Sequence, residues 1–555
     1  MPAKWEEIAA AKRAKLAAAI PKEYLIPESE LPPASRLDVS KVPEEILPKD
    51  VIEITEKTGT ELVAAIAKGE YTSVEVTTAF IKRAVLAHQL LNIFTEFFPE
   101  MALKRAAELD EYYKKTGKTV GPLHGLPMSL KDQFRVKGIE ACMGYVAWVG
   151  KPDEENSTIV DLLLAAGAVF FVKTNIPTSL MAAETRNCVF GQTVNAYNRT
   201  LAPGGSSGGE GAILSMRGAT IGIGTDIGGS IRIPSSFSGV YGLRPSHERF
   251  PYLKVANSPP SPEILTINVK MAYNEVVVSV DGPLAVSLPD LTLFSKALLG
   301  QEPWKHDPRC VPIPFRDYEL PNRPLVFGIE ATDGILTPHP PVLRAMKMVA
   351  DALTKAGHEV FDFQSYKPET GTEILVRSWT VDGGENIRGD LEASGEPGIP
   401  DIAPYIEKDL KSLSQKELFE LNKDKLEYKT EFLEYMNAAK SPSGKKIDAW
   451  IRPVQPCAAV PAGQLKLRYL GYTGLLNVLD YTCVVVPVTK CDPAIDLPAP
   501  APGTGSDAEL EKKVWEDYVP EDFKNGSVGV QIIGGRLEEE KMLAIAGVVD
   551  AALKA

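Results

Sequence analysis

Histidine is scarce and cysteine is scattered in this sequence, and both features exclude kinds of site. The six histidines show no HExxH or HxH spacing, so we expect no zinc site and no catalytic metal. The six cysteines form no CxxC pair, which is typical of reduced thiols in an intracellular protein rather than of a disulfide framework. We therefore predict a cytoplasmic protein.

Long apolar runs and basic clusters are also missing. No stretch of about 18 uncharged apolar residues occurs, and charged residues interrupt the alanine-rich first twenty positions. We therefore expect neither a signal peptide nor a membrane partner. The formal net charge of −13 opposes binding to a phosphate backbone, which needs clustered lysine and arginine, so we expect no nucleic-acid partner.

The order of periodic segments predicts the fold class. Capping boxes begin at Thr58 and Thr72, each before a helical apolar pattern. Strand-like runs at 167–172, 219–224, 325–329 and 483–488 alternate with helical patterns at 159–165, 211–216 and 342–356, the last ending at Gly357. This alternation predicts an α/β fold with a mixed sheet covered by helices.

The N-terminal segment differs from the rest of the chain. Residues 3–18 have the pattern of an amphipathic helix, and residues 21–50 contain six prolines. We predict that residues 1–50 form an N-terminal helix and an extended arm. Because no repeat or linker interrupts the remainder, residues 51–555 are predicted to be one catalytic domain.

Glycine is concentrated between two serines, and several explanations are open. Ten of the 27 residues from Gly204 to Ser230 are glycine, as a tightly packed loop requires. No GxxxxGK[ST] pattern is present, so a nucleotide site is not favoured and no cofactor is expected. Ser207 lies at the centre of a formal GxSxG match, but no strand leads into it, which disfavours a Ser-His-Asp hydrolase.

The same segment fits a serine nucleophile that uses a lysine base. The turn from Asp226 to Ser230 follows a buried strand, and its successive N–H groups can converge on an oxyanion. Lys131 lies in an apolar stretch consistent with burial, and a buried lysine can be neutral enough to act as a base. The alternative for Lys131 is a surface position with Asp132 as its ion-pair partner.

Several motifs together resemble the amidase signature family, and Trp5–Glu7, Tyr241–His247 and Gly300–Lys305 resemble its fungal acetamidase branch. The matching segments are Gly121–Pro127, Ser129–Asp132, Lys173–Pro177, Gly191–Asn195, Gly204–Gly209 and Gly224–Pro234. The resemblance implies an amidase-signature fold, a mixed sheet core between layers of helices. It also implies a Ser-Ser-Lys triad that needs no cofactor.

Carried over position by position, the resemblance assigns a role to each matching residue. Ser230 corresponds to the nucleophile, Ser206 to a bridging serine that follows a cis peptide, and Lys131 to the base. The remaining matches are the oxyanion-hole N–H groups of Ile227, Gly228, Gly229 and Ser230, the supporting residues Ser207, Thr225, Asp226 and Arg232, and the acyl-pocket residues Leu180 and Met181.

The resemblance implies a serine amidohydrolase. Its substrates would be small amides such as acetamide, hydrolysed to a carboxylate and ammonia through an acyl-enzyme on Ser230. An esterase or carbamate (urethane) hydrolase with the same triad is the main alternative. An amidotransferase subunit and an inactive scaffold are less favoured, and a homodimer is a possible assembly.

Overall fold

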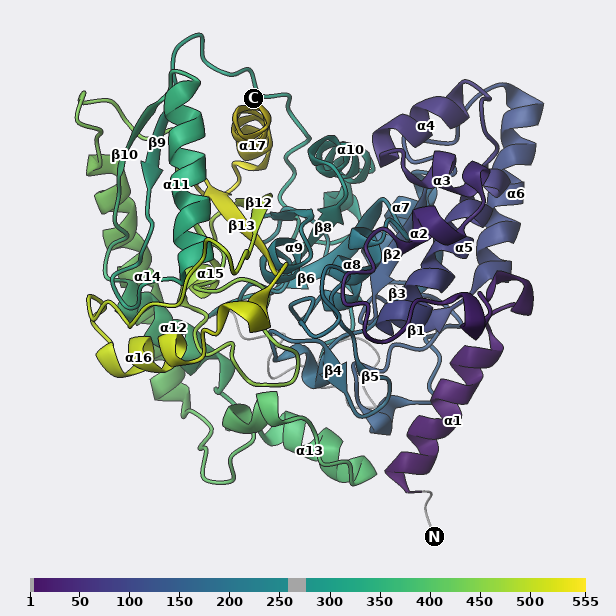
Figure 1. Ribbon diagram of the computed structural model, residues 1–555, viewed down its shortest axis with the longest axis horizontal. Helices are drawn as coiled ribbons and strands as arrows, with labels where there is room; N and C mark the ends of the chain where they lie inside the picture. Colours follow the sequence, from purple (N-terminus) through teal and green to yellow (C-terminus); the bar gives the residue numbers. More distant parts are fainter. Residues whose placement is uncertain (1–3, 258–275) are drawn as a thin grey trace.

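The computed structural model of the chain describes residues 4–257 and 276–555, and one large sheet runs through it (Figure 1). The eleven strands lie in the order β1-β3-β2-β6-β8-β7-β12-β13-β11-β9-β10, and β4 and β5 form a separate pair. Their bounds are β1 Phe94–Phe97, β2 Pro127–Lys131, β3 Val169–Thr174, β4 Arg186–Asn187, β5 Gly191–Gln192, β6 Ile221–Asp226, β7 Tyr241–Arg244, β8 Val280–Ala285, β9 Val326–Ile329, β10 Glu359–Asp362, β11 Ala449–Pro453, β12 Cys483–Lys490 and β13 Ser527–Ile533.

Strand direction changes along the sheet. The neighbours β3, β2 and β6 are parallel, as are β11, β9 and β10. Between these two groups β8, β7, β12 and β13 pair antiparallel with each other and with the groups on either side. The prediction of a mixed sheet is therefore confirmed. The parallel order places the carboxyl ends of β2 and β6 at the same edge, where the predicted lysine and the second serine block lie.

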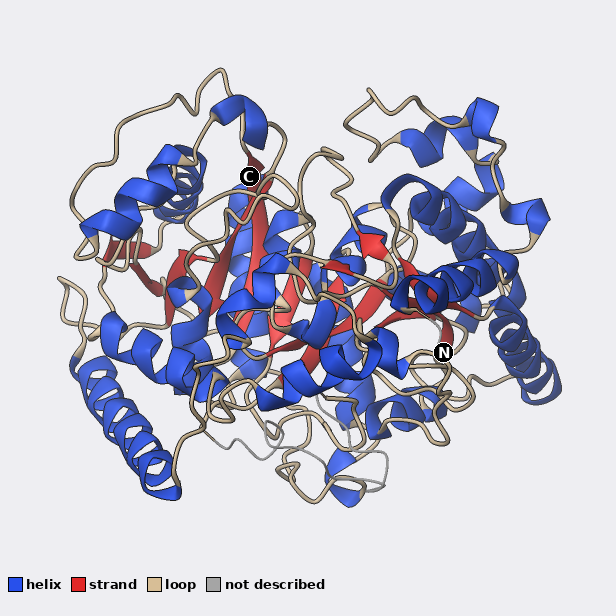
Figure 2. Cartoon of the chain, turned by 90° about the horizontal axis from the view of Figure 1, so that it is seen from below, coloured by secondary structure: helices blue, strands red, loops and turns tan. Residues whose placement is uncertain are grey.

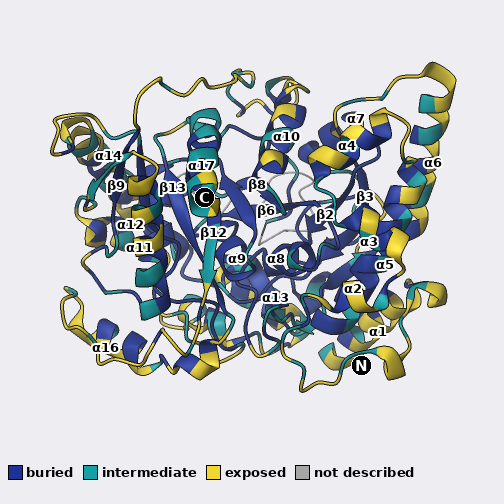
Figure 3. Ribbon diagram, turned by 45° about the horizontal axis from the view of Figure 1, so that its top comes forward, coloured by how far each residue is buried: buried dark blue, intermediate teal, exposed yellow. Residues whose placement is uncertain are grey.

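Helices cover both faces of the sheet, so most of its strands are buried, while the edge strand β10 is half-buried (Figures 2 and 3). The helices are α1 Trp5–Ala18, α2 Val42–Ile46, α3 Lys49–Thr55, α4 Gly59–Ala67, α5 Ser73–Leu91, α6 Pro99–Thr116, α7 Thr158–Ala165, α8 Gly208–Ser215, α9 Arg232–Phe237, α10 Leu288–Leu299, α11 Pro340–Lys355, α12 Pro368–Trp379, α13 Glu385–Ser394, α14 Gln415–Ala438, α15 Gly471–Leu479, α16 Ala508–Glu516 and α17 Glu539–Lys554. Within the described ranges no helix is long and apolar enough to cross a lipid bilayer.

Local sequence signals place several helix ends correctly. Thr58 and Thr72 each accept a hydrogen bond from the N–H group three residues later, and the glutamate at that position reaches back to complete both predicted capping boxes. Ser414 begins α14 in the same way, although the sequence analysis did not identify it. Gly357 follows α11 with a φ of 85°, the left-handed conformation expected of a glycine that ends a helix.

The N-terminal arm is less extended than predicted. Its prolines do not prevent helices, because proline is compatible with a helix's first turn, and Pro43 occupies that position in α2. Pro48 immediately precedes α3, so the predicted boundary at residue 50 falls inside this helix. The arm does lie against the body of the protein, because the Val39 N–H donates to the Ala196 carbonyl at 2.9 Å.

Candidate active site

Lys131 occupies the last position of β2 and is fully buried. Its Nζ lies 2.7 Å from the Ser206 Oγ and 2.7 Å from the Thr225 Oγ1. Burial lowers the pKa of Lys131 to about 7, against the opposing effect of the carboxylates of Asp226 and Glu210. The alternative of a surface lysine paired with Asp132 is therefore wrong. A lysine with this pKa is partly neutral at physiological pH and can accept a proton.

Ser206 lies in the glycine-rich turn that leads into α8, and the Gly205–Ser206 peptide bond is cis. The turn is closely packed. A Cβ on Gly205 would lie 2.7 Å from the Ala183 carbonyl carbon, and one on Gly209 would lie 2.5 Å from the Asn175 nitrogen. Close packing of this backbone fixes the position of the Ser206 hydroxyl beside the lysine.

Ser230 closes the turn between β6 and α9. It is 9% exposed, whereas Ser206 is 1% exposed and Lys131 is fully buried. The Ser207 N–H donates to the Ser230 carbonyl at 3.2 Å, so a backbone hydrogen bond joins the two serine blocks. The Ser230 hydroxyl makes no hydrogen bond to any residue that the structure describes. Of the two serine hydroxyls predicted to belong to the triad, it is therefore the more open to an incoming molecule.

Asp226 and Arg232 hold the shape of the turn. The Arg232 Nη2 lies 2.9 Å from the Asp226 Oδ1, and both side chains are completely buried. Burial alone would raise the pKa of the Asp226 carboxyl, but the charge and hydrogen bonds of Arg232 hold it well below its usual range. The carboxylate also accepts the N–H groups of Gly229 at 2.8 Å and Ile231 at 3.1 Å. These bonds tie the turn to an ion pair that stays charged.

Three of the four N–H groups predicted for the oxyanion hole are free for a ligand. That of Gly229 is taken by Asp226, whereas those of Ile227, Gly228 and Ser230 have no acceptor within the described ranges. Thr473 adds a further constraint, because its hydroxyl donates to the Gly228 carbonyl at 2.6 Å. The backbone N–H groups of Ile227 and Gly228, which are consecutive, and that of Ser230 can therefore donate to a ligand.

The predicted acyl-pocket residues lie in a turn of unusual conformation. Leu180 has a φ of 66°, which a residue with a Cβ seldom adopts, and Met181 is 9% exposed. Two residues further on, Ala183 contacts the backbone of the Gly204–Gly209 turn as described above. The segment therefore passes the site, while the pocket role of Leu180 and Met181 remains a prediction.

Three residues that surround the predicted triad were not predicted from the sequence. Glu210 on α8 accepts from the Ser129 Oγ at 2.5 Å and the Thr174 Oγ1 at 2.6 Å, and burial raises the pKa of Glu210 to about 7. The Gln133 Oε1 accepts from the Thr225 hydroxyl at 2.7 Å. The indole of Trp379 occupies the space that a Cβ on Gly228 would need.

The sequence contains features that could have identified two of these three residues. Gln133 follows the lysine by two positions, and Glu210 is one of two acidic residues, with Asp226, between Gly204 and Ser230. Trp379 comes from a distant helix and carried no local signal. Among the residues that the structure describes, no group of histidine, cysteine, aspartate or glutamate side chains has the arrangement of a metal site.

Comparison with known proteins gives this geometry a family. A family model described as Amidase matches residues 75–543. The chain belongs to the amidase family. The acetamidase of Emericella nidulans is 46% identical, and that of Aspergillus oryzae 44% identical, each over 98% of both chains. The predictions of an amidase, and of a resemblance to fungal acetamidases, are confirmed.

Solved structures support the same assignment. A fatty acid amide hydrolase superposes with a TM-score of 0.89 and 31% sequence identity, covering 99% of this chain and 95% of that one. A peptide amidase from Stenotrophomonas maltophilia has a TM-score of 0.65 at 21% identity, covering 90% and 97%. The predicted amidase-signature fold is thereby confirmed.

Proposed function

We propose that this amidase hydrolyses small carboxylic amides such as acetamide to a carboxylate and ammonia, through an acyl-enzyme on Ser230. The observation that carries the proposal is the 2.7 Å separation of the Lys131 Nζ and the Ser206 Oγ at the buried end of β2. A lysine that is partly neutral there can accept the proton that Ser206 relays from Ser230.

The chemical steps use only groups of this chain, the amide and water. The Ser230 Oγ attacks the amide carbonyl, and its proton passes through Ser206 to Lys131. The free N–H groups of Ile227 and Gly228 stabilise the oxyanion. The same proton returns to the leaving nitrogen as the C–N bond breaks and ammonia departs. Water then attacks the acyl-enzyme by the reverse route and releases the carboxylate.

The restriction to small acyl groups is supported by Trp379. Its indole packs against Gly228 in the turn that carries the proposed oxyanion donors, and its side chain is almost completely buried. A wide aromatic ring beside the reacting carbonyl limits the volume for an acyl chain. The relatives named as acetamidases agree with this size class.

The direct test is covalent labelling and turnover of the purified chain alone. We expect ammonia release from acetamide, and we expect Ser230→Ala to lose at least about 10³-fold in kcat together with labelling by a fluorophosphonate probe. Ser235→Ala is the matched control, because Ser235 is a buried serine of α9 whose hydroxyl donates to the Ile231 carbonyl at 2.8 Å. It should be labelled normally. Undiminished labelling of Ser230→Ala would assign the nucleophile elsewhere, with Ser207 examined first.

A substrate panel separates the alternatives. Turnover of esters or carbamates in preference to amides of the same acyl group would favour the esterase or urethanase alternative. Activity that appears only with added protein subunits would favour an amidotransferase. The cytoplasmic location and the division into residues 1–50 and a catalytic domain of residues 51–555 remain part of this proposal.

A further inference from the structure

Gln133 is linked to the proposed base through a hydroxyl. The Lys131 Nζ lies 2.7 Å from the Thr225 Oγ1, and that hydroxyl donates to the Gln133 Oε1 at 2.7 Å. Gln133 is itself fully buried. Its Nε2 donates to the Ala256 carbonyl at 3.1 Å, and the Ala256 N–H donates to the Gln133 carbonyl at 3.0 Å. Backbone bonds on both sides therefore hold the residue in place.

The Ala256 carbonyl sets the donor and the acceptor in each hydrogen bond from Gln133 through Thr225 to Lys131. A backbone carbonyl only accepts, so the amide nitrogen of Gln133 faces Ala256 and the amide oxygen faces Thr225. An amide oxygen also only accepts, so the single hydroxyl proton of Thr225 points to Gln133. Thr225 then has only lone pairs to offer Lys131, which must donate an N–H to it.

This direction leaves the lysine lone pair available to the bridging serine. A neutral amine has two N–H donors and one lone pair. With one N–H engaged by Thr225, the lone pair can accept the proton of the Ser206 hydroxyl 2.7 Å away. We propose that Gln133 is a positioning residue that sets the polarity of the Lys131–Thr225 bond and so directs the base towards Ser206. The proposal rests on the function proposed above.

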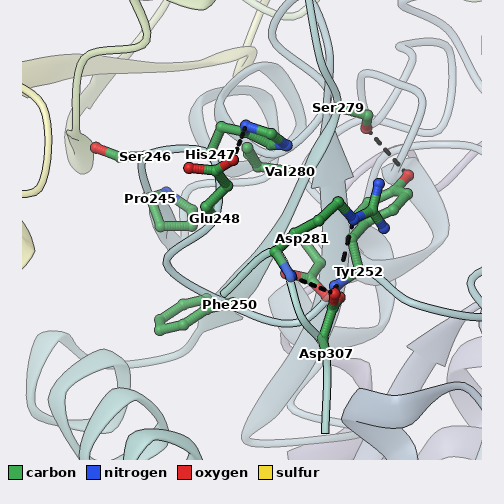
Figure 4. Close-up of a pocket in the computed structure, with 11 residues that line it drawn as sticks. Pro245, Ser246, His247, Glu248, Phe250, Tyr252, Ser279, Val280, Asp281 and Asp307 are labelled. Atoms are coloured by element: carbon green, nitrogen blue, oxygen red, sulfur yellow. Dashed lines mark hydrogen bonds and ion pairs between the residues drawn. The ribbon is translucent and has the colours of Figure 1, made fainter. Parts of the chain in front are cut away.

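Tyr252 is a secondary support for the same amide. The Gln133 Nε2 also donates to its hydroxyl at 3.1 Å, and that hydroxyl lies 3.1 Å from both the Asn257 Oδ1 and the Ser279 Oγ. Figure 4 shows the Tyr252 hydroxyl directed to Ser279 at the edge of a small pocket that also contains Asp281. Since a hydroxyl can donate or accept, Tyr252 does not fix the amide, and the Ala256 carbonyl does.

Loss of the Gln133 acceptor has a specific chemical consequence. The Thr225 proton is then free to turn towards Lys131 and to occupy its lone pair, in competition with Ser206. This bond stabilises neutral lysine, so the pKa of Lys131 falls while its capacity to accept from Ser206 is reduced. The charged groups that face Lys131, Asp226 and Glu210, are unchanged by the substitution.

The experiment measures the second-order rate of fluorophosphonate labelling at Ser230 against pH. For Gln133→Met we expect a plateau at least about tenfold below wild type, within the 10²–10⁴ that general-base catalysis contributes, and a midpoint moved to lower pH. Gln133→Glu keeps an acceptor for Thr225 at the same place. Its plateau should stay within about threefold of wild type, with no movement of the midpoint to lower pH.

Two further variants show whether Gln133 acts through Thr225. In a Thr225→Val background the Gln133→Met change should have no additional effect, because the hydroxyl that it orients is gone. Gln89→Met is the matched control: Gln89 also uses both amide atoms, which bind the backbone nitrogen and oxygen of Ile26 instead of a hydroxyl next to the base. Its labelling profile should equal that of wild type.

Each outcome decides the proposal. A Gln133→Met profile with an unmoved midpoint, or additive effects with Thr225→Val, would overturn the role of Gln133 while leaving Ser230 as the nucleophile. If Gln133→Met does not fold, slow labelling of a folded Gln133→Glu would overturn it equally. A wild-type chain that is not labelled at Ser230 would overturn the proposed function, and the role of Gln133 with it.

Discussion

Lys131 is the residue on which the proposed chemistry depends, and opposing forces set its proton affinity. Burial at the end of β2 favours the neutral amine, while Asp226 and Glu210 favour the ammonium. Burial prevails and lowers the pKa from an ordinary value of about 10.4 to about 7. An exposed lysine at the same position would be protonated at neutral pH and useless as a base.

The first prediction is therefore a pH dependence with a defined sign. Below pH 7 Lys131 is protonated and has no lone pair, so kcat/KM should fall about tenfold per pH unit, and above that value it should reach a plateau. Lys131→Ala should remove both the rise and most of the rate. Lys131→Arg should also be inactive, because a guanidinium stays protonated. The measurement is kcat/KM against pH with a substrate that does not titrate.

Two results would contradict the assignment of Lys131 as the base. A rise that survives unchanged in Lys131→Ala would assign the base to another group, such as a histidine. Two candidates are already disfavoured, because burial lowers the pKa of His88 and of His339 to about 4. An active Lys131→Arg enzyme with an unchanged profile would show that Lys131 is structural.

For single residues, the sequence predicted which side chains form the site better than it predicted the hydrogen bonds between them. Lys131, Ser206 and Thr225 lie within hydrogen-bond distance as their motifs indicated, because β2 and β6 are parallel neighbours. The amide of Gln133 could not be assigned, because its direction depends on a carbonyl 123 residues away. Trp379 likewise acquires its place only through the packing of α12 near the turn.

At the scale of elements, α12 positions Trp379 at its last residue. The indole contacts Gly228 and meets the Tyr405 ring edge-on at 6.1 Å. Trp379→Ala should open space beside the turn. We expect kcat/KM for hexanamide relative to acetamide to rise at least about tenfold, since even one additional buried methylene is worth about 1–3 kcal/mol in such pockets. Initial rates with amides of graded acyl length measure the ratio.

A matched control separates selectivity from stability. Trp515 on α16 is buried to a similar degree, and Trp515→Ala should cost a similar amount of stability, about 3–5 kcal/mol, without changing the substrate ratio. If Trp379→Ala leaves the ratio at the wild-type value, Trp379 does not limit the acyl group.

The N-terminal helix is joined to the sheet by a buried charge cluster. Lys12 on α1 is 3% exposed and forms ion pairs with Glu96 of β1 and with Glu140, the latter at 2.9 Å. Lys12→Met would leave two carboxylates without their central partner. We expect a loss of about 3–5 kcal/mol in the free energy of unfolding, measured by denaturant titration.

Lys15 supplies the control for this cluster. It also pairs with Glu140, at 2.7 Å, but its side chain is 68% exposed, so Lys15→Met should cost only about 0–1 kcal/mol. If residues 1–50 unfold independently of the catalytic domain, Lys12→Met will shift an early, separate transition and leave the main one in place. The predicted separation of the arm from the domain can thus be measured.

The elements were predicted unevenly, for physical reasons. Helix starts with a capping box and strands with a continuous apolar run were identified, because their signals are local. The helices within the arm were missed, because proline permits both an extended chain and a helix's first turn, and only contact with the body decides between them.

At the scale of the whole molecule, Arg232 links the turn that carries Ser230 to distant parts of the chain. Arg232 binds Asp226 from the same turn, but it also donates to the Asn477 Oδ1 at 2.6 Å and to the Gln531 Oε1 at 3.0 Å. These partners are 245 and 299 residues away along the chain. The turn that carries Ser230 therefore requires the C-terminal half to be in place, while one catalytic domain over residues 51–555 stays a prediction.

The outer surface has a feature that bears on assembly. Helix α14, at the edge of the molecule in Figure 1, has apolar side chains on two opposite faces. One face is buried against the body and contains Leu421, Tyr428 and Phe432. The other contains Phe419, Leu426 and Leu433, which are seven residues apart and 64%, 65% and 54% exposed. This spacing is that of a helix seam which packs against another helix.

The last prediction is that a second copy of the chain covers this seam in a two-fold homodimer. In a two-fold, antiparallel pairing of α14 with itself, Leu426 meets its own copy on the axis and Phe419 meets Leu433 of the other subunit, so the seam is self-complementary. Leu426→Glu would place two like charges opposite each other and should give a monomer. Leu497→Glu is the control, since Leu497 is 60% exposed in the loop between β12 and α16, and it should leave the dimer intact. Sedimentation velocity at micromolar concentrations distinguishes the states; a monomeric wild type, or a Leu426→Glu chain that still dimerises, would show that the seam does not join two copies.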